Sequence, residues 1–329
     1  MEAFSSLNLI GQSSQFLDAL QMMRRLAVCD AGVLIHGEIG TGKEVAARAV
    51  HYLGRRRDGP FIPVNCGAVP DSLFENELFG HVRGAFTDAR DTASGLIANA
   101  EGGTLFLDEV EALSAKGQVA LLRFLQDGTY KPLGGKRLVD ANVRIIAASN
   151  RSVREMVARG EFRADLMYRL AVMPLDLPPL RERDGDVPLL AGHFVARFSE
   201  QYDTVKKLSP ASIAALDAHD WPGNVRELEN LLHREVLLSD GETIELGSRI
   251  GPVGSGPGRD SRDVLGFERG FHAAKASCVA EFERRFVSWA LKQSGGNVTA
   301  AARRAGTERR SFGRLVRKYG ADPERFAAD

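Results

Sequence analysis

A glycine-rich run that ends in a lysine is the first part of the chain whose residue types could do chemistry. The run consists of Gly37, Glu38, Ile39, Gly40, Thr41, Gly42 and Lys43. This is the spacing of a P-loop, in which backbone N–H groups close around phosphate oxygens while a helix N-terminus and the lysine supply positive potential. A glycine-rich turn without nucleotide would fit the spacing alone. Glu44 follows, where a P-loop usually has a Ser or Thr that reaches magnesium.

Two adjacent carboxylates, Asp108 and Glu109, end the apolar run 105–107. At a strand end, Asp108 could hold Mg²⁺, and Glu109 could act as general base on the water that attacks the γ-phosphate of ATP. Taken alone, the pair could also be the solvated acidic end of a strand. Together with an upstream P-loop, the two acids predict an ATP-hydrolysing site.

The C-terminal segment 297–319 carries a local positive charge that could bind DNA. Its net charge is +6, although the whole chain has 43 basic and 43 acidic residues. The basic residues are Arg303, Arg304, Arg309, Arg310, Arg314, Arg317 and Lys318. A basic amphipathic pair of helices with no DNA role would have the same charge. The arrangement of the segment favours a DNA-binding helix-turn-helix.

Two short helices are expected in this segment. Asn297 should cap the first, Gly306 should make the turn, and Thr307 should start the second. The residues expected to face inward are Val298, Ala301, Ala302, Phe312, Leu315 and Val316. The residues that open the second helix, Thr307, Glu308, Arg309 and Arg310, are expected to contact base edges, and Arg314 should also face the groove. Arg317 and Lys318 are expected to contact phosphate.

Four short apolar runs predict the sheet that positions the first two groups of residues. They cover residues 33–37, 61–65, 103–109 and 143–150. Continuous Val, Ile, Leu and Phe runs are typical of parallel strands buried on both faces. Helix-length patterns such as 43–53 and 116–126 lie between them. The predicted fold class is therefore α/β, with a doubly wound parallel sheet.

The chain is expected to divide into four parts. Residues 1–173 should form the α/β ATPase subdomain, and residues 174–246, which lack a comparable strand signal, a helical lid subdomain. Residues 247–265 begin with a Gly, Ser and Pro-rich stretch that predicts a flexible linker. Residues 266–329 should form a small all-α helix-turn-helix domain that begins with a long helical pattern.

Composition and cysteine usage place the chain among globular proteins. It is 44% hydrophobic and 26% charged, and it has neither a secretory signal nor a run long enough to span a membrane. Cys29, Cys66 and Cys278 are odd in number and far apart. This pattern suits reduced thiols better than disulfides or a zinc site, so a cytoplasmic location is expected.

Six longer motifs follow one another along the chain. They are GEIGTGKE (37–44), ELFGHVRGAFTDA (77–89), GGTLFLDE (102–109), FRADLMYRL (162–170), LPPLRER (177–183) and WPGNVREL (221–228). In this order they resemble the bacterial enhancer-binding proteins, the AAA+ activators of sigma-54 RNA polymerase. The resemblance runs from about Leu9 to Leu238 and resumes in the terminal segment, which is similar to a Fis-type helix-turn-helix.

The resemblance implies a function for the whole chain. Members of the family bind upstream double-stranded DNA and use ATP and Mg²⁺ to remodel the closed complex of promoter and sigma-54 RNA polymerase holoenzyme. The motifs begin within ten residues of Met1, so we expect no N-terminal regulatory domain and control by a separate regulatory protein or a ring partner. A replication or repair AAA+ ATPase would lack both the sigma-54 loop and this terminal segment.

The resemblance also implies roles at the nucleotide. The family carries Glu after the P-loop lysine, so Glu44 is a family trait and joins the P-loop among the expected nucleotide contacts. Asn65 matches the residue that restrains the catalytic Glu109 until substrate engagement. Ser149 and Asn150 match a sensor pair near the γ-phosphate.

Three arginines are implied to act on the nucleotide from farther away. Arg163 and Arg169 match arginine fingers that complete the active site of the neighbouring subunit, and Arg226 matches the lid arginine that contacts nucleotide. An arginine supplied in trans stabilises charge on the transferring phosphoryl group, so hydrolysis should depend on assembly. We expect a homo-oligomer, from dimer to hexamer, or a mixed ring with a related activator.

The loop implied to contact sigma-54 departs from the family pattern. The family has Gly-Ala-Phe-Thr-Gly-Ala, and residues 84–89 here have Asp88 at the fifth position. Phe86 and Thr87, the implied contact residues, are kept. An Asp can adopt turn conformations and preserve the loop. Alternatively the polymerase contact is altered or lost, and the chain is a DNA-binding regulator with ATP-controlled assembly that does not remodel sigma-54 polymerase.

Overall fold

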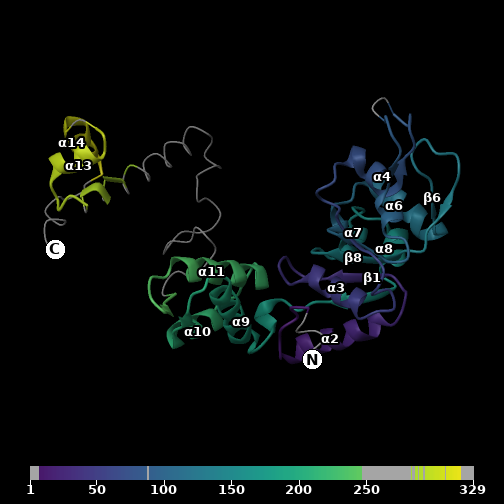
Figure 1. The fold of residues 1–329 in the computed structure, drawn as a ribbon, viewed down its shortest axis with the longest axis horizontal. Helices are drawn as coiled ribbons and strands as arrows, with labels where there is room; N and C mark the ends of the chain where they lie inside the picture. Colours follow the sequence, from purple (N-terminus) through teal and green to yellow (C-terminus); the bar gives the residue numbers. More distant parts are fainter. Residues whose placement is uncertain are drawn as a thin grey trace. The chain divides into compact units, whose positions relative to one another are not determined.

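The structure is a computed structural model, and it separates the chain into two compact units, Met1–Ile250 and Gly251–Asp329 (Figure 1). It describes residues 7–86, 89–246, 283, 286–287, 289–291, 293–307 and 309–319. The predicted linker 247–265 lies outside the described residues, as do Thr87, Asp88, Cys278 and Glu308. Within the described parts, no helix has the length and apolar character needed to cross a membrane.

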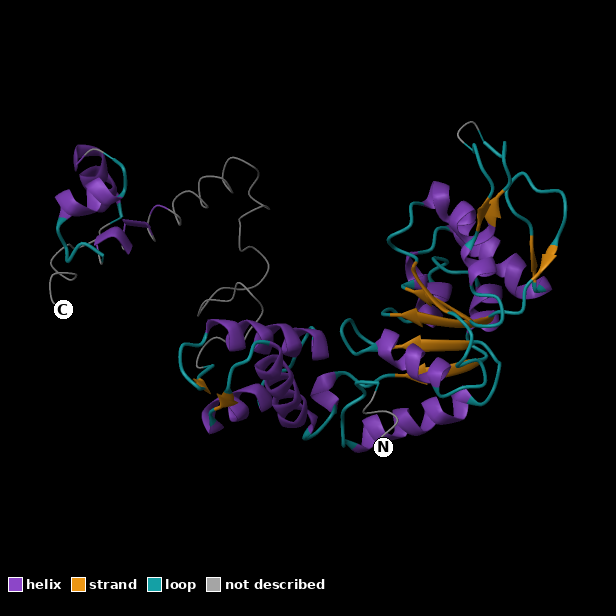
Figure 2. Cartoon of the chain, in the orientation of Figure 1, coloured by secondary structure: helices purple, strands orange, loops and turns teal. Residues whose placement is uncertain are grey.

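A parallel sheet forms the centre of the first unit (Figure 2). Its strand order is β2-β5-β8-β1-β9. The strands are β1 (Val33–His36), β2 (Phe61–Asn65), β5 (Thr104–Asp108), β8 (Arg144–Ser149) and β9 (Met173–Asp176). The first four agree with the predicted runs to within one residue at each end. The predicted α/β fold class is confirmed.

The edge strand β9 is not predicted by the sequence pattern. Met173–Asp176 pairs in parallel with β1, with Pro174 opposite Leu34. A subdomain boundary after residue 173 would therefore cut a strand of the sheet, and the inference that strand signals end there is wrong. The strand has only 4 residues, and Pro174 cannot donate a ladder hydrogen bond. Both features are tolerated at a sheet edge but give little strand signal.

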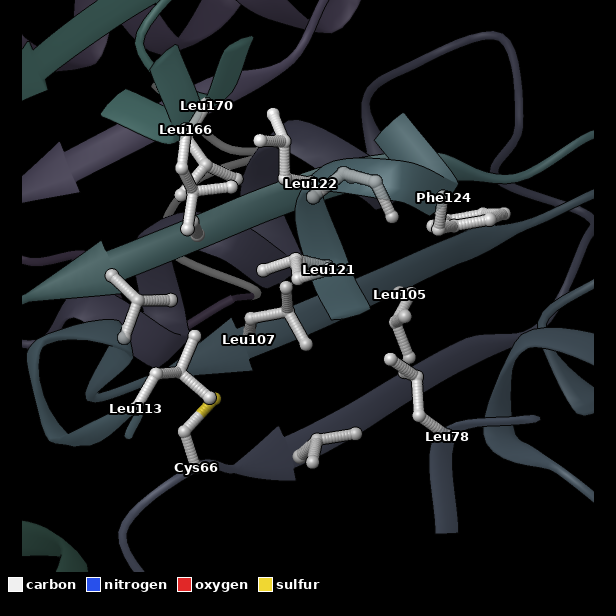
Figure 3. Packing of buried hydrophobic residues seen from close by; sticks show 14 of the residues in the cluster. Cys66, Leu78, Leu105, Leu107, Leu113, Leu121, Leu122, Phe124, Leu166 and Leu170 are labelled. Carbon is white, nitrogen blue, oxygen red and sulfur yellow. The ribbon is translucent and has the colours of Figure 1, made fainter. Parts of the chain in front are cut away.

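Helices cover both faces of the sheet (Figure 1). The helices α2 (Ser14–Ala27) and α3 (Lys43–Tyr52) share one apolar core with Phe106 of β5. On the other face, α4 (Asp71–Phe79), α6 (Ala115–Asp127) and α8 (Ala164–Leu170) pack against Leu105 and Leu107 (Figure 3). Successive side chains of a strand point to opposite faces, so β5 contributes to both cores.

Short elements complete the α/β part. They are β3 (Gly80–His81), β4 (Ala93–Ser94), α5 (Leu96–Asn99), η1 (Val110–Ala112), β6 (Thr129–Tyr130), β7 (Val139–Asp140) and α7 (Val153–Ala158). The antiparallel pair β3 and β4 forms the base of the predicted sigma-54 loop.

The helical lid subdomain of the first unit has its own core. Its elements are η2 (Leu180–Glu182), α9 (Asp186–Gln201), β10 (Lys207–Leu208), α10 (Pro210–Asp217), α11 (Asn224–Leu238) and β11 (Thr243–Ile244). The fully buried side chains of Trp221, Leu228 and Leu232 lie at the centre of this core. The strand β10, between α9 and α10, pairs in parallel with β11, which follows α11.

The described part of the second unit contains two packed helices, α13 (Val298–Arg304) and α14 (Arg309–Lys318). The side chain of Asn297 caps α13 by accepting hydrogen bonds from the backbone N–H groups of Thr299 and Ala300. Gly306 makes the turn with φ +63°. Ala301, Ala302, Phe312 and Val316 are buried, and Val298 and Leu315 pack against them. The inward residues agree with the sequence prediction, whereas α14 begins at Arg309 and the prediction began this helix at Thr307.

Candidate functional site

The glycine-rich run lies between β1 and α3 as a closed loop. Gly40 and Gly42 have φ +80° and +97°, values that favour glycine strongly. The Nζ of Lys43 donates hydrogen bonds to the carbonyl oxygens of Gly37 (2.8 Å) and Glu38 (3.0 Å). The hydroxyl of Thr41 donates to the same Glu38 carbonyl at 2.9 Å. The loop is thus shaped around its own lysine at the N-terminus of α3, a suitable place for phosphate.

Lys43 and Asp108 form the charged centre of the site. Burial lowers the pKa of Lys43, and the nearby charges of Asp108 and Glu111 oppose that shift. Burial also raises the pKa of Asp108, against the effect of the Glu109 backbone N–H, which donates to its Oδ1 at 3.1 Å. The phosphates and cation of a nucleotide would restore interactions that these partly buried charges lose with water.

Glu109 leaves β5 in a left-handed conformation, with φ +55°. A Cβ on Gly67 would lie 2.8 Å from Oε2 of Glu109 and 3.3 Å from Oδ1 of Asn65. The missing side chain of Gly67 therefore leaves room for the Glu109 carboxylate beside Asn65. Asn65 accepts hydrogen bonds from the N–H groups of Gly67 (2.8 Å) and Ala68 (3.1 Å). The described hydrogen bonds include none between Asn65 and Glu109.

Glu111 is a site residue that the sequence prediction omits. Its Oε1 accepts a hydrogen bond from the backbone N–H of Asn150 at 3.2 Å. Its Oε2 is buried with no partner among the described residues. Burial lowers the pKa of Lys43 and raises that of Asp108, and the charge of Glu111 opposes the first shift and adds to the second. The sequence could have pointed to Glu111, because this third acid comes two residues after Glu109, in the turn that follows the strand.

The predicted sensor pair lies at the end of β8, next to the glycine-rich loop. The carbonyl oxygen of Ser149 accepts from the N–H of Gly37 at 3.3 Å. The buried hydroxyl of Ser149 donates to the carbonyl of Arg151 at 2.7 Å. Ser149 thus fixes the turn after β8, and Asn150 follows it beside Glu111.

The side chains of Glu38 and Glu44 form ion pairs with arginines outside the glycine-rich loop. The carboxylate of Glu38 makes a bidentate ion pair with Arg181 of the lid subdomain, at 2.6 and 2.9 Å. This pair lowers the pKa of Glu38. Glu44 makes an ion pair with Arg48, one turn later in α3, at 2.7 Å. The structure therefore gives both predicted nucleotide contacts a different partner.

The predicted arginines occupy three positions on the first unit. Arg226, on α11, lies near the loop. Its backbone N–H donates to the Gly40 carbonyl at 3.4 Å. The charge of its side chain adds to the effect of burial in lowering the pKa of Lys43. Arg163 is exposed and bound to Asp165 through contacts of 2.7 and 3.0 Å. Arg169 is exposed in the last turn of α8. In the described part of the chain, neither Arg163 nor Arg169 contacts its own Lys43 or Asp108.

The loop above β3 and β4 presents an exposed aromatic ring. The side chain of Phe86 is 44% exposed and lies 4.9 Å from the ring of His81. The loop closes through the N–H of Gly84 to the Ala89 carbonyl (2.8 Å) and the N–H of Ala89 to the Phe86 carbonyl (3.0 Å). The Phe86 ring is therefore only partly covered by its own chain.

The predicted DNA-contacting residues of the second unit are solvent-exposed where the structure describes them. They are Thr307, Arg309, Arg310, Arg314, Arg317 and Lys318. Lys318 differs from the others because its Nζ donates to the Glu283 carboxylate at 2.9 Å. Its charge is thus partly compensated within its own unit.

The nucleotide site offers Mg²⁺ few protein ligands, as is common for this cation. Among the residues described, there is no group of three or more His, Cys, Asp or Glu side chains that could hold a metal. Mg²⁺ commonly binds through one or two carboxylates, water and the phosphates of a substrate. Asp108, at the end of β5 and close to Lys43, is suited to be that carboxylate.

Two family models match the first unit of the chain. The sigma-54 interaction domain matches residues 9–176, and the AAA+ ATPase lid domain matches residues 181–248. The chain is 41% identical to the regulatory protein AtoC of Escherichia coli over 317 residues, which cover 96% of this chain and 68% of AtoC. It is 47% identical to the DNA-binding transcriptional regulator NtrC of Azospirillum brasilense over 245 residues, 74% of this chain and 51% of NtrC.

The chain is also similar to solved structures of NtrX from Brucella abortus. One superposes with a TM-score of 0.69 at 30% identity, covering 95% of this chain and 69% of NtrX. A complex of NtrX with ATP superposes with a TM-score of 0.66 at 31% identity, covering 95% of this chain and 69% of that one. The chain spans 60% of the length of the nitrogen fixation protein AnfA of Azotobacter vinelandii, to which it is 41% identical over 329 residues, 99% of this chain.

Proposed function

Because the chain belongs to the sigma-54 interaction family of AAA+ ATPases, we propose that it is an ATP-hydrolysing activator of sigma-54-dependent transcription. The observation that carries the proposal is the arrangement of Lys43, Asp108 and Glu109 around one loop. NtrX, with a similar fold, has been solved with ATP. The proposed substrate is therefore ATP, with Mg²⁺ as the cation.

Each charged group has a distinct part in hydrolysis. The glycine-rich loop and Lys43 bind the phosphates, and Asp108 would hold Mg²⁺, which would neutralise charge on the phosphate oxygens. Glu109 accepts the proton of the attacking water. Its left-handed backbone and its place beside Asn65 hold the carboxylate at the strand end. We assign Arg163 and Arg169 to the neighbouring subunit's site, where they stabilise the transferring phosphoryl group.

The exposed loop with Phe86 is the proposed contact with sigma-54 RNA polymerase holoenzyme. Its exposure supports that role, because a large aromatic side chain at a loop tip can be buried against a partner at little conformational cost. Thr87 is included in the proposed contact and lies outside the described residues, as does Asp88. Asp88 keeps a second function open, a DNA-binding regulator that uses ATP for assembly but does not remodel polymerase.

The proposal is tested by separating nucleotide binding, hydrolysis and activation. Lys43→Ala should abolish ATP binding, whereas Glu109→Gln should bind ATP but not hydrolyse it, because the carboxylate acts only on water during the reaction. ATP affinity, turnover and transcription from a sigma-54 promoter are measured for each variant. Normal turnover by Glu109→Gln would overturn the catalytic assignment. Activation by Asp88→Gly but not by the natural chain would select the second function.

A further inference from the structure

Asn224 is a buried amide between the lid subdomain and the nucleotide loop. It begins α11 with φ +51° and is 0% exposed. Its Oδ1 accepts from the N–H of Leu180 at 2.7 Å. Its Nδ2 donates to the carbonyl of Ile39 at 2.9 Å and to Oε2 of Glu38 at 3.2 Å. One side chain thus joins two parts of the lid to two consecutive residues of the loop.

The backbone around Asn224 fits closely against the same stretch of loop. A Cβ on Gly40 would lie 2.2 Å from the carbonyl oxygen of Gly223, too close for any side chain. The N–H of Arg226 donates to the carbonyl of Gly40 at 3.4 Å. The start of α11 therefore contacts the loop at Glu38, Ile39 and Gly40.

The Asn224 amide binds the loop directly beside Gly40, whose backbone conformation favours glycine. Gly40, with φ +80°, directly follows the residue whose carbonyl Asn224 holds. The carbonyl of Glu38, the residue before Ile39, accepts from Lys43 Nζ at 3.0 Å. The hydrogen bond from Asn224 orients the peptide group between Ile39 and Gly40. The orientation of this group affects the direction of the loop N–H groups that would face phosphate. It also affects the neighbouring Glu38 carbonyl, to which Lys43 is bound.

We propose that Asn224 is a positioning residue for nucleotide binding: its amide holds the loop in the phosphate-binding shape only while the start of α11 is seated on it. This inference rests on the proposed ATPase function. It predicts that lid position and nucleotide affinity are linked through this side chain, because moving α11 away removes the hydrogen bond to Ile39. By linkage, nucleotide binding would favour the seated lid equally.

Asn224→Asp is the substitution that tests the amide most directly. Asp tolerates a left-handed backbone nearly as well as Asn. It keeps an oxygen to accept from Leu180, but it cannot donate to Ile39 and it repels the Glu38 carboxylate. We expect affinity for a fluorescent ADP analogue to fall about tenfold or more, since a buried acceptor loses its donor. Asn230→Asp makes the same change of charge at an exposed position of α11 and should bind as the natural chain does.

Rescue separates positioning from simple damage to the fold. In the Asn224→Asp background, Glu38→Gln removes the repulsion and supplies an amide donor, so part of the lost affinity should return. Thermal melting without nucleotide is measured for the same four chains. The proposal is overturned if Asn224→Asp binds nucleotide normally, or if affinity falls only in proportion to melting temperature and Glu38→Gln restores none of it.

Lys43→Ala distinguishes failure of this inference from failure of the proposed function. If Lys43→Ala loses the ADP analogue and Asn224→Asp retains it, the ATP site stands and the role of Asn224 is wrong. If Lys43→Ala also binds normally, the nucleotide site itself is misplaced and both proposals fall.

Discussion

Glu109 shows how one backbone conformation can aim a catalytic group. A left-handed residue other than glycine costs roughly 1 kcal/mol or more, and Glu109 has φ +55° where β5 ends. If the backbone at Glu109 kept the extended conformation of β5, its carboxylate would point away from Gly67 and Asn65. The cost is consistent with selection for the position of the carboxylate, since strain of this kind concentrates at functional sites.

The residue types at the site could be predicted from sequence, but their contacts only in part. Lys43, Asp108 and Glu109 stand out because the motif places them at fixed offsets from a strand. Asn224 does not stand out in the sequence, because its role depends on a contact with Glu38, which is 186 residues away along the chain. The partner of Glu38 in the lid, Arg181, is also set by the packing of the two subdomains, which residue spacing does not encode.

Cys66 provides a prediction at the same scale. It is 4% exposed and packs beside Leu113 in the core of Figure 3. Burial, followed by the negative charges of Asp108 and Glu111, raises the pKa of its thiol to about 12. A raised thiol pKa means that the reactive thiolate is scarce below that pH, roughly one part in ten thousand at pH 8.

Native Cys66 should therefore resist iodoacetamide at pH 8 and react only after unfolding. Cys29, which is partly exposed, is the internal control and should be labelled first. The measurement is the time course of labelling at each cysteine by peptide mass spectrometry, with and without urea. Labelling of native Cys66 as fast as Cys29 would contradict both its burial and its raised pKa.

Among the elements, the strands with continuous apolar runs were predicted, whereas β9, β10 and β11 were missed. Strand β8 is buried at every position, so its Ile and Ala content reports directly on its place in the sheet. Strand β9 and the pair β10 and β11 have 4, 2 and 2 residues. The two-residue strands β10 and β11 carry too little pattern to be recognised, and β9, although as long as β1, contains Pro174 and Asp176, whereas β1 begins with three apolar residues.

A buried ion pair joins the first residues of the unit to the lid subdomain. Asp186, at the start of α9, is 0% exposed and accepts from Arg183 Nε at 2.8 Å. It also accepts from the N–H of Gln12 (2.6 Å) and from the N–H and hydroxyl of Ser13 (3.0 and 2.9 Å). Arg183 in turn donates to the carbonyl of Ile10 at 2.7 Å. One carboxylate thus ties the segment before α2 to the lid.

Asp186→Ala should lower the free energy of unfolding by about 3 kcal/mol or more, because it leaves the Arg183 guanidinium buried without its charged partner. Urea unfolding followed by circular dichroism measures the change. Glu182→Ala, at an exposed position nearby, should alter the midpoint little. A change below about 1 kcal/mol for Asp186→Ala would show that water replaces the lost contacts.

At the scale of the whole molecule, the positions of the arginines predict that activity requires assembly. Arg163 and Arg169 are exposed and make no described contact with Lys43 or Asp108 of their own chain. We expect a ring, a hexamer as in the family, in which each subunit completes its neighbour's site. ATP turnover per subunit should then rise with protein concentration, in step with the assembled fraction seen by sedimentation.

Mixing two inactive variants tests the same assembly more directly. A ring of Arg169→Ala and Lys43→Ala subunits contains sites where an intact Lys43 meets an intact Arg169 from its neighbour. Such mixtures should regain part of the turnover, whereas each variant alone should stay inactive. Turnover that is independent of concentration, or mixtures that regain nothing, would show that the arginines act within their own chain or not at all.

The second unit should confer DNA recognition without affecting ATP chemistry. The two units are compact separately, so a chain that ends at residue 250 should retain ATPase activity and lose site-specific DNA binding. Binding by the full chain should weaken steeply with salt, because arginine side chains displace counterions from phosphate. A truncated chain that still finds its site would refute the assignment.

Within α14, the two ends of the helix should differ in what they contact. Arg310 is exposed in the first turn and can reach a base edge, so Arg310→Ala should weaken a preferred site more than random DNA, by roughly 1–3 kcal/mol. Arg317, exposed in the last turn, should contact phosphate, and Arg317→Ala should weaken binding to both duplexes about equally.

Lys318→Ala should have a smaller effect than Arg317→Ala, because the Glu283 carboxylate already accepts a hydrogen bond from Lys318 Nζ at 2.9 Å. Titrations of specific and random duplexes at two salt concentrations measure all three variants. Equal losses on both duplexes for Arg310→Ala would mean that the start of α14 does not enter the groove.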